Sequence, residues 1–115
     1  MKKLIFLILI LTFSCKSGVD IELNNQSDIT IDNIILSNGF DSLNIKSLKP
    51  MEKRNVFLKF NKKNNSDGSY RIECQINNKK IIKNFGYYSN GIPTNSSYLL
   101  VISKDSIRVK EYPKN

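Results

Sequence analysis

The segment Tyr70–Asn77 reads YRIECQIN, and its first seven residues alternate between side chains that are usually buried in proteins and polar side chains. Successive side chains of a β-strand point to opposite faces, so this alternation predicts a strand with one buried and one solvated face. Cys74 falls on the buried face, where we expect a free thiol that packs as a small hydrophobe. Apolar surroundings raise the pKa of a thiol, and the sequence therefore predicts an unreactive cysteine.

Similar alternation extends from this segment through most of the chain after residue 18. Towards the C-terminus, Asn77-Asn78 suits a tight hairpin turn that leads into a strand through Phe85. Residues 86–95 (GYYSNGIPTN) are predicted to form a long loop, and a last hairpin follows at 98–109. Towards the N-terminus, further strands are predicted around residues 19–23, 29–36, 43–48 and 56–60, and the most polar loop at 61–68. The alternation slips at Asp32-Asn33, which indicates a β-bulge or a strand that crosses between sheets.

Seven or eight short strands at this spacing predict an all-β domain over residues 19–112. An antiparallel β-sandwich is the expected architecture, and a small β-barrel is the alternative. The Asn-Ser-rich turn before Ile29-Thr30-Ile31, followed later by Leu48-Lys49-Pro50-Met51-Glu52, resembles immunoglobulin-like modules of bacterial surface proteins. The resemblance implies an immunoglobulin-like sandwich that binds, spaces or displays and that has no shared catalytic residues. The chain lacks the core Trp and the bridged Cys pair of antibody domains.

The start of the chain has the pattern of an export signal. Lys2 and Lys3 precede the apolar run Leu4–Leu11, which is shorter than the roughly 20 residues that cross a bilayer. Ser14 then precedes Cys15, and this resembles a bacterial lipobox. The resemblance implies that residues 1–14 are a signal peptide, that Cys15 becomes the lipid-modified N-terminus, and that residues 15–18 form a short tether.

Two other interpretations of the leader stay open, because Thr12 and Phe13 depart from the usual lipobox residues. Thr12 and Ser14 also satisfy ordinary signal peptidase, which would release a soluble protein, and an uncleaved leader would act as an anchor. Two or three acyl chains on Cys15 would hold the protein on a membrane, at about 0.8 kcal/mol per buried CH₂. Enteric lipoproteins kept in the inner membrane carry Asp after the Cys, whereas Lys16 stands here. We therefore expect the outer membrane, with the domain facing either the periplasm or the outside.

Composition argues against catalysis. The chain has 18 Lys and Arg, 10 Asp and Glu, and no His. Without His there is no Ser-His or Cys-His nucleophile and no ordinary zinc site, so we expect no enzyme, no cofactor and no metal. Asp20 and Glu22 share one face of a predicted strand and are interpreted as solvated surface. Loss of the two leader lysines leaves a net charge of +6, which favours anionic partners in general.

Binding is the function that the sequence favours: a non-enzymatic, membrane-anchored module of the cell envelope that takes a protein or polysaccharide. An envelope inhibitor or immunity-type lipoprotein is the first alternative, and an enzyme is the second. Nucleic acid is not expected, because export removes it and no aromatic platform is interleaved with the basic residues. The oligomeric state is not predicted.

Two sets of residues are candidate sites. The first is the predicted loop, where one tyrosine should anchor the chain and its neighbour should face outward. Its candidate binding residues are Tyr87, Tyr88, Asn90, Pro93 and Asn95. The second set is Ser42 and Ser106, each in an Asp-Ser-aliphatic triplet that resembles an O-glycosylation acceptor of some Gram-negative envelopes. Asp-Ser is also common in turns, which is the competing interpretation.

Overall fold

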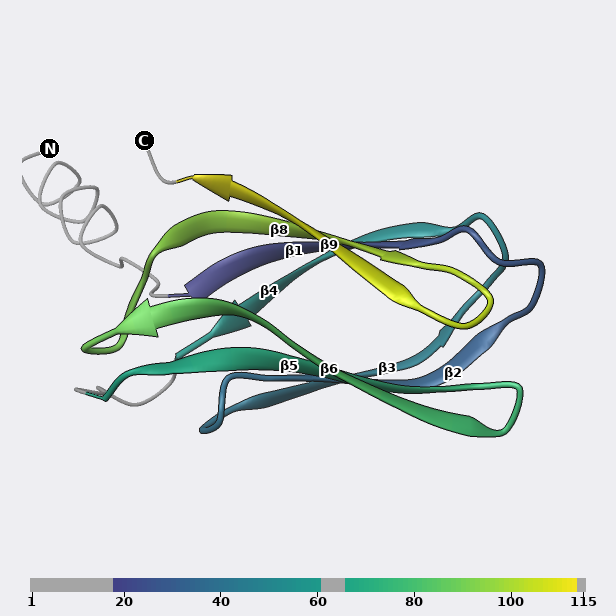
Figure 1. Cartoon of the computed structure of the whole chain (residues 1–115), viewed down its shortest axis with the longest axis horizontal. Coiled ribbons are helices and arrows are strands. Elements are labelled where there is room, and N and C mark those ends of the chain that lie inside the picture. The colour runs from purple at the N-terminus through teal and green to yellow at the C-terminus, as the bar shows by residue number, and fades with distance from the viewer. Residues whose placement is uncertain (1–17, 61–65, 114–115) are drawn as a thin grey trace, which may run out of the picture.

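The computed structural model describes residues 18–60 and 66–113, which form nine β-strands and no helix (Figure 1). The predicted lipidation site, Cys15, lies outside these residues. The strands are β1 (Gly18–Asn25), β2 (Ile31–Ser37), β3 (Ser42–Leu48), β4 (Lys53–Lys59), β5 (Gly68–Ile76), β6 (Lys79–Ser89), β7 (Ile92–Pro93), β8 (Asn95–Ile102) and β9 (Ile107–Pro113).

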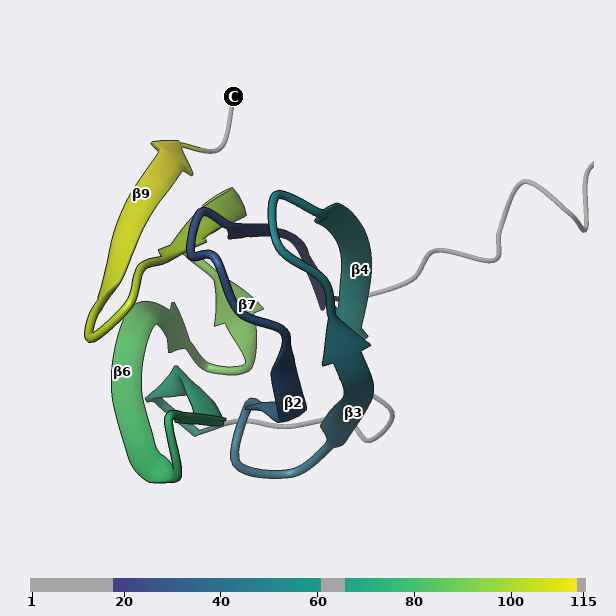
Figure 2. The same cartoon turned by 90° about the vertical axis from the view of Figure 1, so that its right-hand side faces the viewer.

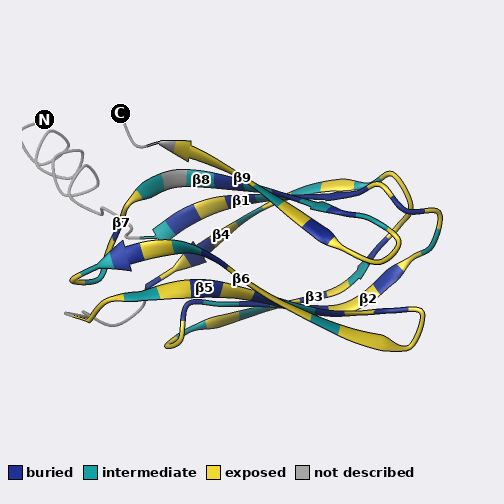
Figure 3. Ribbon diagram, viewed as in Figure 1, coloured by how far each residue is buried: buried dark blue, intermediate teal, exposed yellow. Residues whose placement is uncertain are grey.

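The strands make two sheets that lie face to face, with the core between them (Figure 2). The first sheet has the order β4-β1-β8-β9, and the second has the order β3-β2-β5-β6-β7. Buried and exposed positions alternate along most strands, because one face of each sheet packs on the core (Figure 3). The predicted all-β sandwich is confirmed.

The arrangement of β1 differs from the antiparallel prediction. This strand pairs antiparallel with β4 and parallel with β8, so that Leu23 stands beside Leu100. In antibody domains the first strand lies beside the second, whereas here β2 belongs to the other sheet. Alternation along a strand shows which side chains are buried but carries no information about the direction of the neighbouring strand. The sequence pattern therefore could not reveal this parallel pair.

The strand predicted around Cys74 is confirmed as β5, the central strand of its sheet. Its apolar positions are buried, and Arg71 and Gln75 on the other face are exposed. Cys74 is a free cysteine with 1% of its surface exposed, and burial raises the pKa of its thiol to about 11. Asn77 and Asn78 follow with φ angles of 52° and 61°, the positive values that a two-residue hairpin turn of type I′ needs.

The slip in alternation near Asp32 is a β-bulge. Asp32 pairs with Gln75 and Ile35 pairs with Glu73, so the β2 side of the ladder contains one more residue than the β5 side. Asn33 has a φ of 53° at this point. The extra residue keeps both Ile31 and Ile34 in the core.

The prediction of a loop at residues 86–95 is wrong, because most of these residues belong to β-strands. β6 continues to Ser89, turns at Asn90 and Gly91, and returns as β7. Gly86 has a φ of 68° and lies where the register between β5 and β6 shifts. A glycine in a bulge bends a strand without ending it, whereas the sequence interpretation took this glycine as the start of a loop.

Two buried asparagines hold the ends of the sandwich. At the end where β1 begins, which we call the Gly18 end, Asn38 Oδ1 accepts hydrogen bonds from the backbone nitrogens of Phe40 and Asp41 at 2.9 and 2.7 Å. At the opposite end, which we call the Asn25 end, the Asn25 amide donates to the carbonyl oxygens of Ile29 and Leu48 at 2.9 and 3.0 Å. Each side chain thus satisfies backbone groups that the turns would otherwise leave buried and unpaired.

Candidate ligand-binding site

Adjacent tyrosines of β6 point in opposite directions, as alternation along a strand predicts. Tyr88 is 4% exposed, and its hydroxyl donates a hydrogen bond to the Asn38 carbonyl oxygen at 2.7 Å. Its ring packs edge-on against Phe60, with 5.0 Å between centroids. Tyr87 is 46% exposed, and the nearby Asp67 carboxylate raises its pKa. Tyr88 is therefore a structural residue, and Tyr87 is available at the surface.

The other candidate residues of this hairpin have mainly structural contacts. The backbone nitrogen of Asn90 donates to Asp67 Oδ1 at 2.9 Å, and Pro93 is buried. The Asn95 side-chain oxygen accepts hydrogen bonds from the hydroxyls of Thr94, at 3.1 Å, and Tyr98, at 3.4 Å. Of the five candidate residues, Tyr87 and Asn90 alone have exposed side chains, so the predicted set does not form one binding surface.

The two candidate acceptor serines lie at opposite ends of the sandwich. Ser42 is the first residue of β3, at the Gly18 end, and Ser106 precedes β9 at the Asn25 end. Both are exposed. Their accessibility suits a modification, but it is equally what a turn residue would show.

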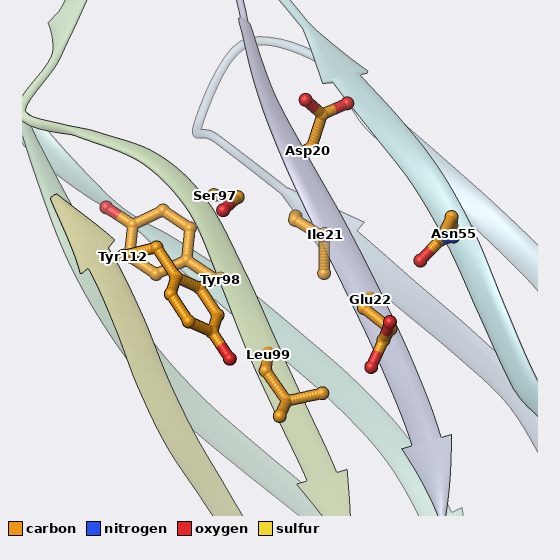
Figure 4. Close-up of a pocket in the computed structure, with 8 residues that line it drawn as sticks. All are labelled: Asp20, Ile21, Glu22, Asn55, Ser97, Tyr98, Leu99 and Tyr112. Atoms are coloured by element: carbon orange, nitrogen blue, oxygen red, sulfur yellow. The ribbon is translucent and has the colours of Figure 1, made fainter. Parts of the chain in front are cut away.

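A hollow lies on the outer face of the β4-β1-β8-β9 sheet, and the sequence interpretation missed it. Its volume is about 480 Å³. Figure 4 shows the Tyr112 ring on one side and the Asp20 and Glu22 carboxylates on the other, with Ser97 and Leu99 between them. Asn55 lies beyond Glu22 on β4.

Strand pairing explains how residues far apart in sequence come together here. Asp20 of β1 pairs with Ser97 of β8, and Ser97 pairs with Tyr112 of β9. Two residues further along β1, Glu22 pairs with Asn55 on one side and with Leu99 on the other. The parallel pairing of β1 with β8 creates both rows, so the hollow could not be predicted without it.

The carboxylates of the hollow have no ion-pair partner within residues 18–60 and 66–113. The ion pairs in this part of the chain join Glu52 to Arg54 and Glu73 to Lys80. Asp20 and Glu22 are thus open acceptors in a chain with excess positive charge. The Tyr112 ring stands on the other side of Ser97 and Leu99, with the Lys110 ammonium 5.6 Å from its centroid. The hollow combines hydrogen-bond acceptors with an apolar wall.

The described part of the chain contains no helix of the length and hydrophobicity that crossing a membrane requires. Nor do three or more His, Cys, Asp or Glu side chains within the described ranges come together as a metal site.

The fold defines the chain as an all-β sandwich protein, and comparison with known proteins adds a likeness of fold. No protein-family model matches the sequence, and no curated protein matches it. Among solved structures, the chain is similar to an NMR structure of a protein from Eubacterium rectale, with a TM-score of 0.57 and 13% sequence identity. The match covers 86% of this chain and 92% of that one. At this identity the likeness extends to the fold alone.

Proposed function

We propose that the chain is a lipoprotein of the bacterial cell envelope, anchored through acylated Cys15, and that it acts as a non-enzymatic binding module. The ligand occupies the hollow on the β4-β1-β8-β9 sheet. One observation carries this proposal: Asp20 and Glu22 line the same hollow as the Tyr112 ring and have no ion pair to any described residue. Unpaired acceptors next to an exposed ring are a typical recognition surface.

The chemistry of the hollow favours a glycan. A sugar ring has an apolar face that can stack on an aromatic side chain and hydroxyl groups that can donate to carboxylates. Asn55 adds an amide that both donates and accepts, and Ser97 adds a hydroxyl. The hollow is open along the sheet, which suits a chain of sugars better than a small molecule that must be enclosed. Envelope polysaccharides are thus the ligand class that we propose.

Photo-crosslinking in intact cells tests where the ligand binds. A photoreactive amino acid is placed at Asn55, which borders the hollow, and in a second strain at Asn84, an exposed asparagine on the outer face of the other sheet. The Asn55 position should capture a partner that the Asn84 position does not. Glu22→Gln and Tyr112→Ala should each reduce this capture and leave the melting temperature nearly unchanged, because both side chains lie on the outer face.

Two results would contradict the proposal. Capture that is equal at both positions would mean that the hollow has no special role, and capture of a protein in place of a polysaccharide would overturn the ligand class. The anchor is tested separately by fatty-acid labelling, which Cys15→Ser should abolish. Labelling that persists in Cys15→Ser would exclude Cys15 as the attachment point.

A further inference from the structure

We propose that the Gly18 end of the sandwich lies against the bilayer, with the exposed side chains of Phe40 and Ile92 in contact with lipid. This inference rests on the proposed acylation of Cys15. Given that anchor, it assigns an orientation to the domain and a membrane-contact surface to two turns.

The first argument is the length of the tether. Three residue steps separate Cys15 from Gly18, the first residue of β1. A fully extended chain covers at most about 3.6 Å per residue, so the tether spans at most about 11 Å. The eight residues of β1 then run away from the anchor for about 26 Å, at about 3.3 Å per residue. The Gly18 end is therefore held at the membrane surface, and the Asn25 end can reach a full strand length above it.

The second argument is that two turns at this same end present exposed apolar side chains, Phe40 in the β2–β3 turn and Ile92 directly after the β6–β7 turn (Figure 1). The turn that carries Phe40 is joined to the end of β4 by a hydrogen bond of 3.3 Å from the Asn38 amide to the Lys59 carbonyl oxygen, and Lys59 pairs with Gly18. The β6–β7 hairpin, which contains Ile92, is joined to the first turn through Tyr88, whose hydroxyl donates to the Asn38 carbonyl oxygen. Phe40 is 55% exposed and Ile92 is 58% exposed.

The third argument is the distribution of exposed aromatic side chains. Four are exposed in the described part of the chain: Phe40, Phe57, Tyr87 and Tyr112. All four lie in the half of the sandwich nearer to Gly18, since Phe57 and Tyr112 belong to the same cross-strand row as Asp20. Tyr gathers at membrane interfaces because an apolar ring carries a polar hydroxyl, and Phe is common on the apolar side of segments that lie in the interface.

The contact that this geometry supports is shallow. Asp67 also lies at this end, where its carboxylate accepts a hydrogen bond from the Asn90 backbone. A charged group near the contact keeps the domain at the level of the headgroups, because burying an ion in hydrocarbon is costly. Phe40 and Ile92 thus reach the boundary between headgroups and acyl chains while the sheets stay in water.

Tryptophan fluorescence tests this orientation, because the chain contains no Trp. Three variants of the full lipoprotein, Phe40→Trp, Ile92→Trp and Lys104→Trp, are reconstituted in vesicles of phosphatidylethanolamine and phosphatidylglycerol. Lys104 is the matched control, an exposed residue in the β8–β9 turn at the Asn25 end. The vesicles contain lipids brominated near the top of the acyl chain, which quench a tryptophan only at short range. The Phe40→Trp and Ile92→Trp variants should lose most of their fluorescence, and Lys104→Trp should retain it.

Flotation and quenching together separate a failure of the orientation from a failure of the anchor. Protein that floats with the vesicles but shows no quenching at Phe40→Trp or Ile92→Trp overturns the orientation and leaves the anchor in place. Equal quenching of all three variants also overturns it, because the domain would then lie on its side. Protein that does not float with the vesicles overturns the anchor and the orientation together. If one of the two turn variants fails to fold by circular dichroism, the other still decides the question.

Discussion

Tyr70→Phe should leave the domain as stable as before or make it more stable, although it removes a polar atom from the centre of the core. Tyr70 is fully buried, and its hydroxyl has no hydrogen-bond partner among the described residues. Its ring contacts four others, those of Phe60, Phe85, Tyr88 and Tyr98, with centroid distances from 5.5 to 6.5 Å. Phenylalanine would keep all of these ring contacts and remove only the unsatisfied group.

The expected magnitude follows from the cost of burying an unpaired hydroxyl, which is about 1–3 kcal/mol. Recovering even 1 kcal/mol of this would raise the melting temperature by about 4–8 °C for a domain of this size. Tyr88→Phe is the matched control. It removes a hydroxyl that donates to the Asn38 carbonyl at 2.7 Å and should cost about 1–2 kcal/mol, because that oxygen is left unpaired.

Urea and thermal unfolding of both variants in a soluble Cys15→Ser background would measure the difference. A loss of more than about 1 kcal/mol in Tyr70→Phe would refute the reasoning, because it would mean that the hydroxyl has a partner such as a buried water. Equal losses in the two variants would refute it as well.

Three further predictions concern the ends and bends of the sandwich. Asn25→Ala should cost about 3 kcal/mol in urea unfolding, because several buried backbone groups lose their partner, whereas Asn24→Ala, which removes no side-chain hydrogen bond to a described residue, should cost less than about 1 kcal/mol. Gly86→Ala should lower the melting temperature more than Gly39→Ala does. Both glycines have a positive φ, but only at Gly86 would the added Cβ collide with the Tyr98 hydroxyl. Equal losses of stability would contradict this. The Lys49 backbone nitrogen and the Arg54 guanidinium hold the pKa of Glu52 below its usual value. The Glu52 carboxylate therefore stabilises the fold above about pH 4.5, and this stabilisation is lost as the pH falls. A Glu52→Gln variant should show a shallower loss of stability between neutral and acidic pH.

The sequence predicted the structure best where apolar and polar side chains alternate strictly. The segment around Cys74 alternates without a break and is a central strand with a buried thiol. The break at Asp32-Asn33 was equally informative, since a bulge is the simplest way to keep apolar residues on one face when the period fails. Asn77-Asn78 specified its turn because few other residues accept two consecutive positive φ angles.

The hollow could not be predicted from alternation along single strands. Asp20 and Glu22 were correctly assigned to an outer face, but their neighbours Ser97 and Tyr112 lie far away in sequence and come near only through pairing between strands. The prediction of a loop at residues 86–95 was wrong for a different reason. A glycine followed by two tyrosines and a second glycine has the composition of a loop, and it was the packing of Tyr88 and Tyr98 against the core that made it a bulged strand.

The position of β1 determines how the domain would bear a mechanical load. Any force that pulls on an anchor at Cys15 enters the fold at Gly18 and acts along the axis of β1. This strand is hydrogen bonded on both sides, to β4 over seven pairs and to β8 over six. The hydrogen bonds cross between the strands in both ladders, perpendicular in the antiparallel one and slanted in the parallel one, so a pull along β1 loads many of them in shear at once and does not open them one at a time. An edge strand in the same position would peel away under a smaller force. Given the proposed anchor at Cys15, we expect the domain to resist mechanical unfolding by a force that acts through that anchor.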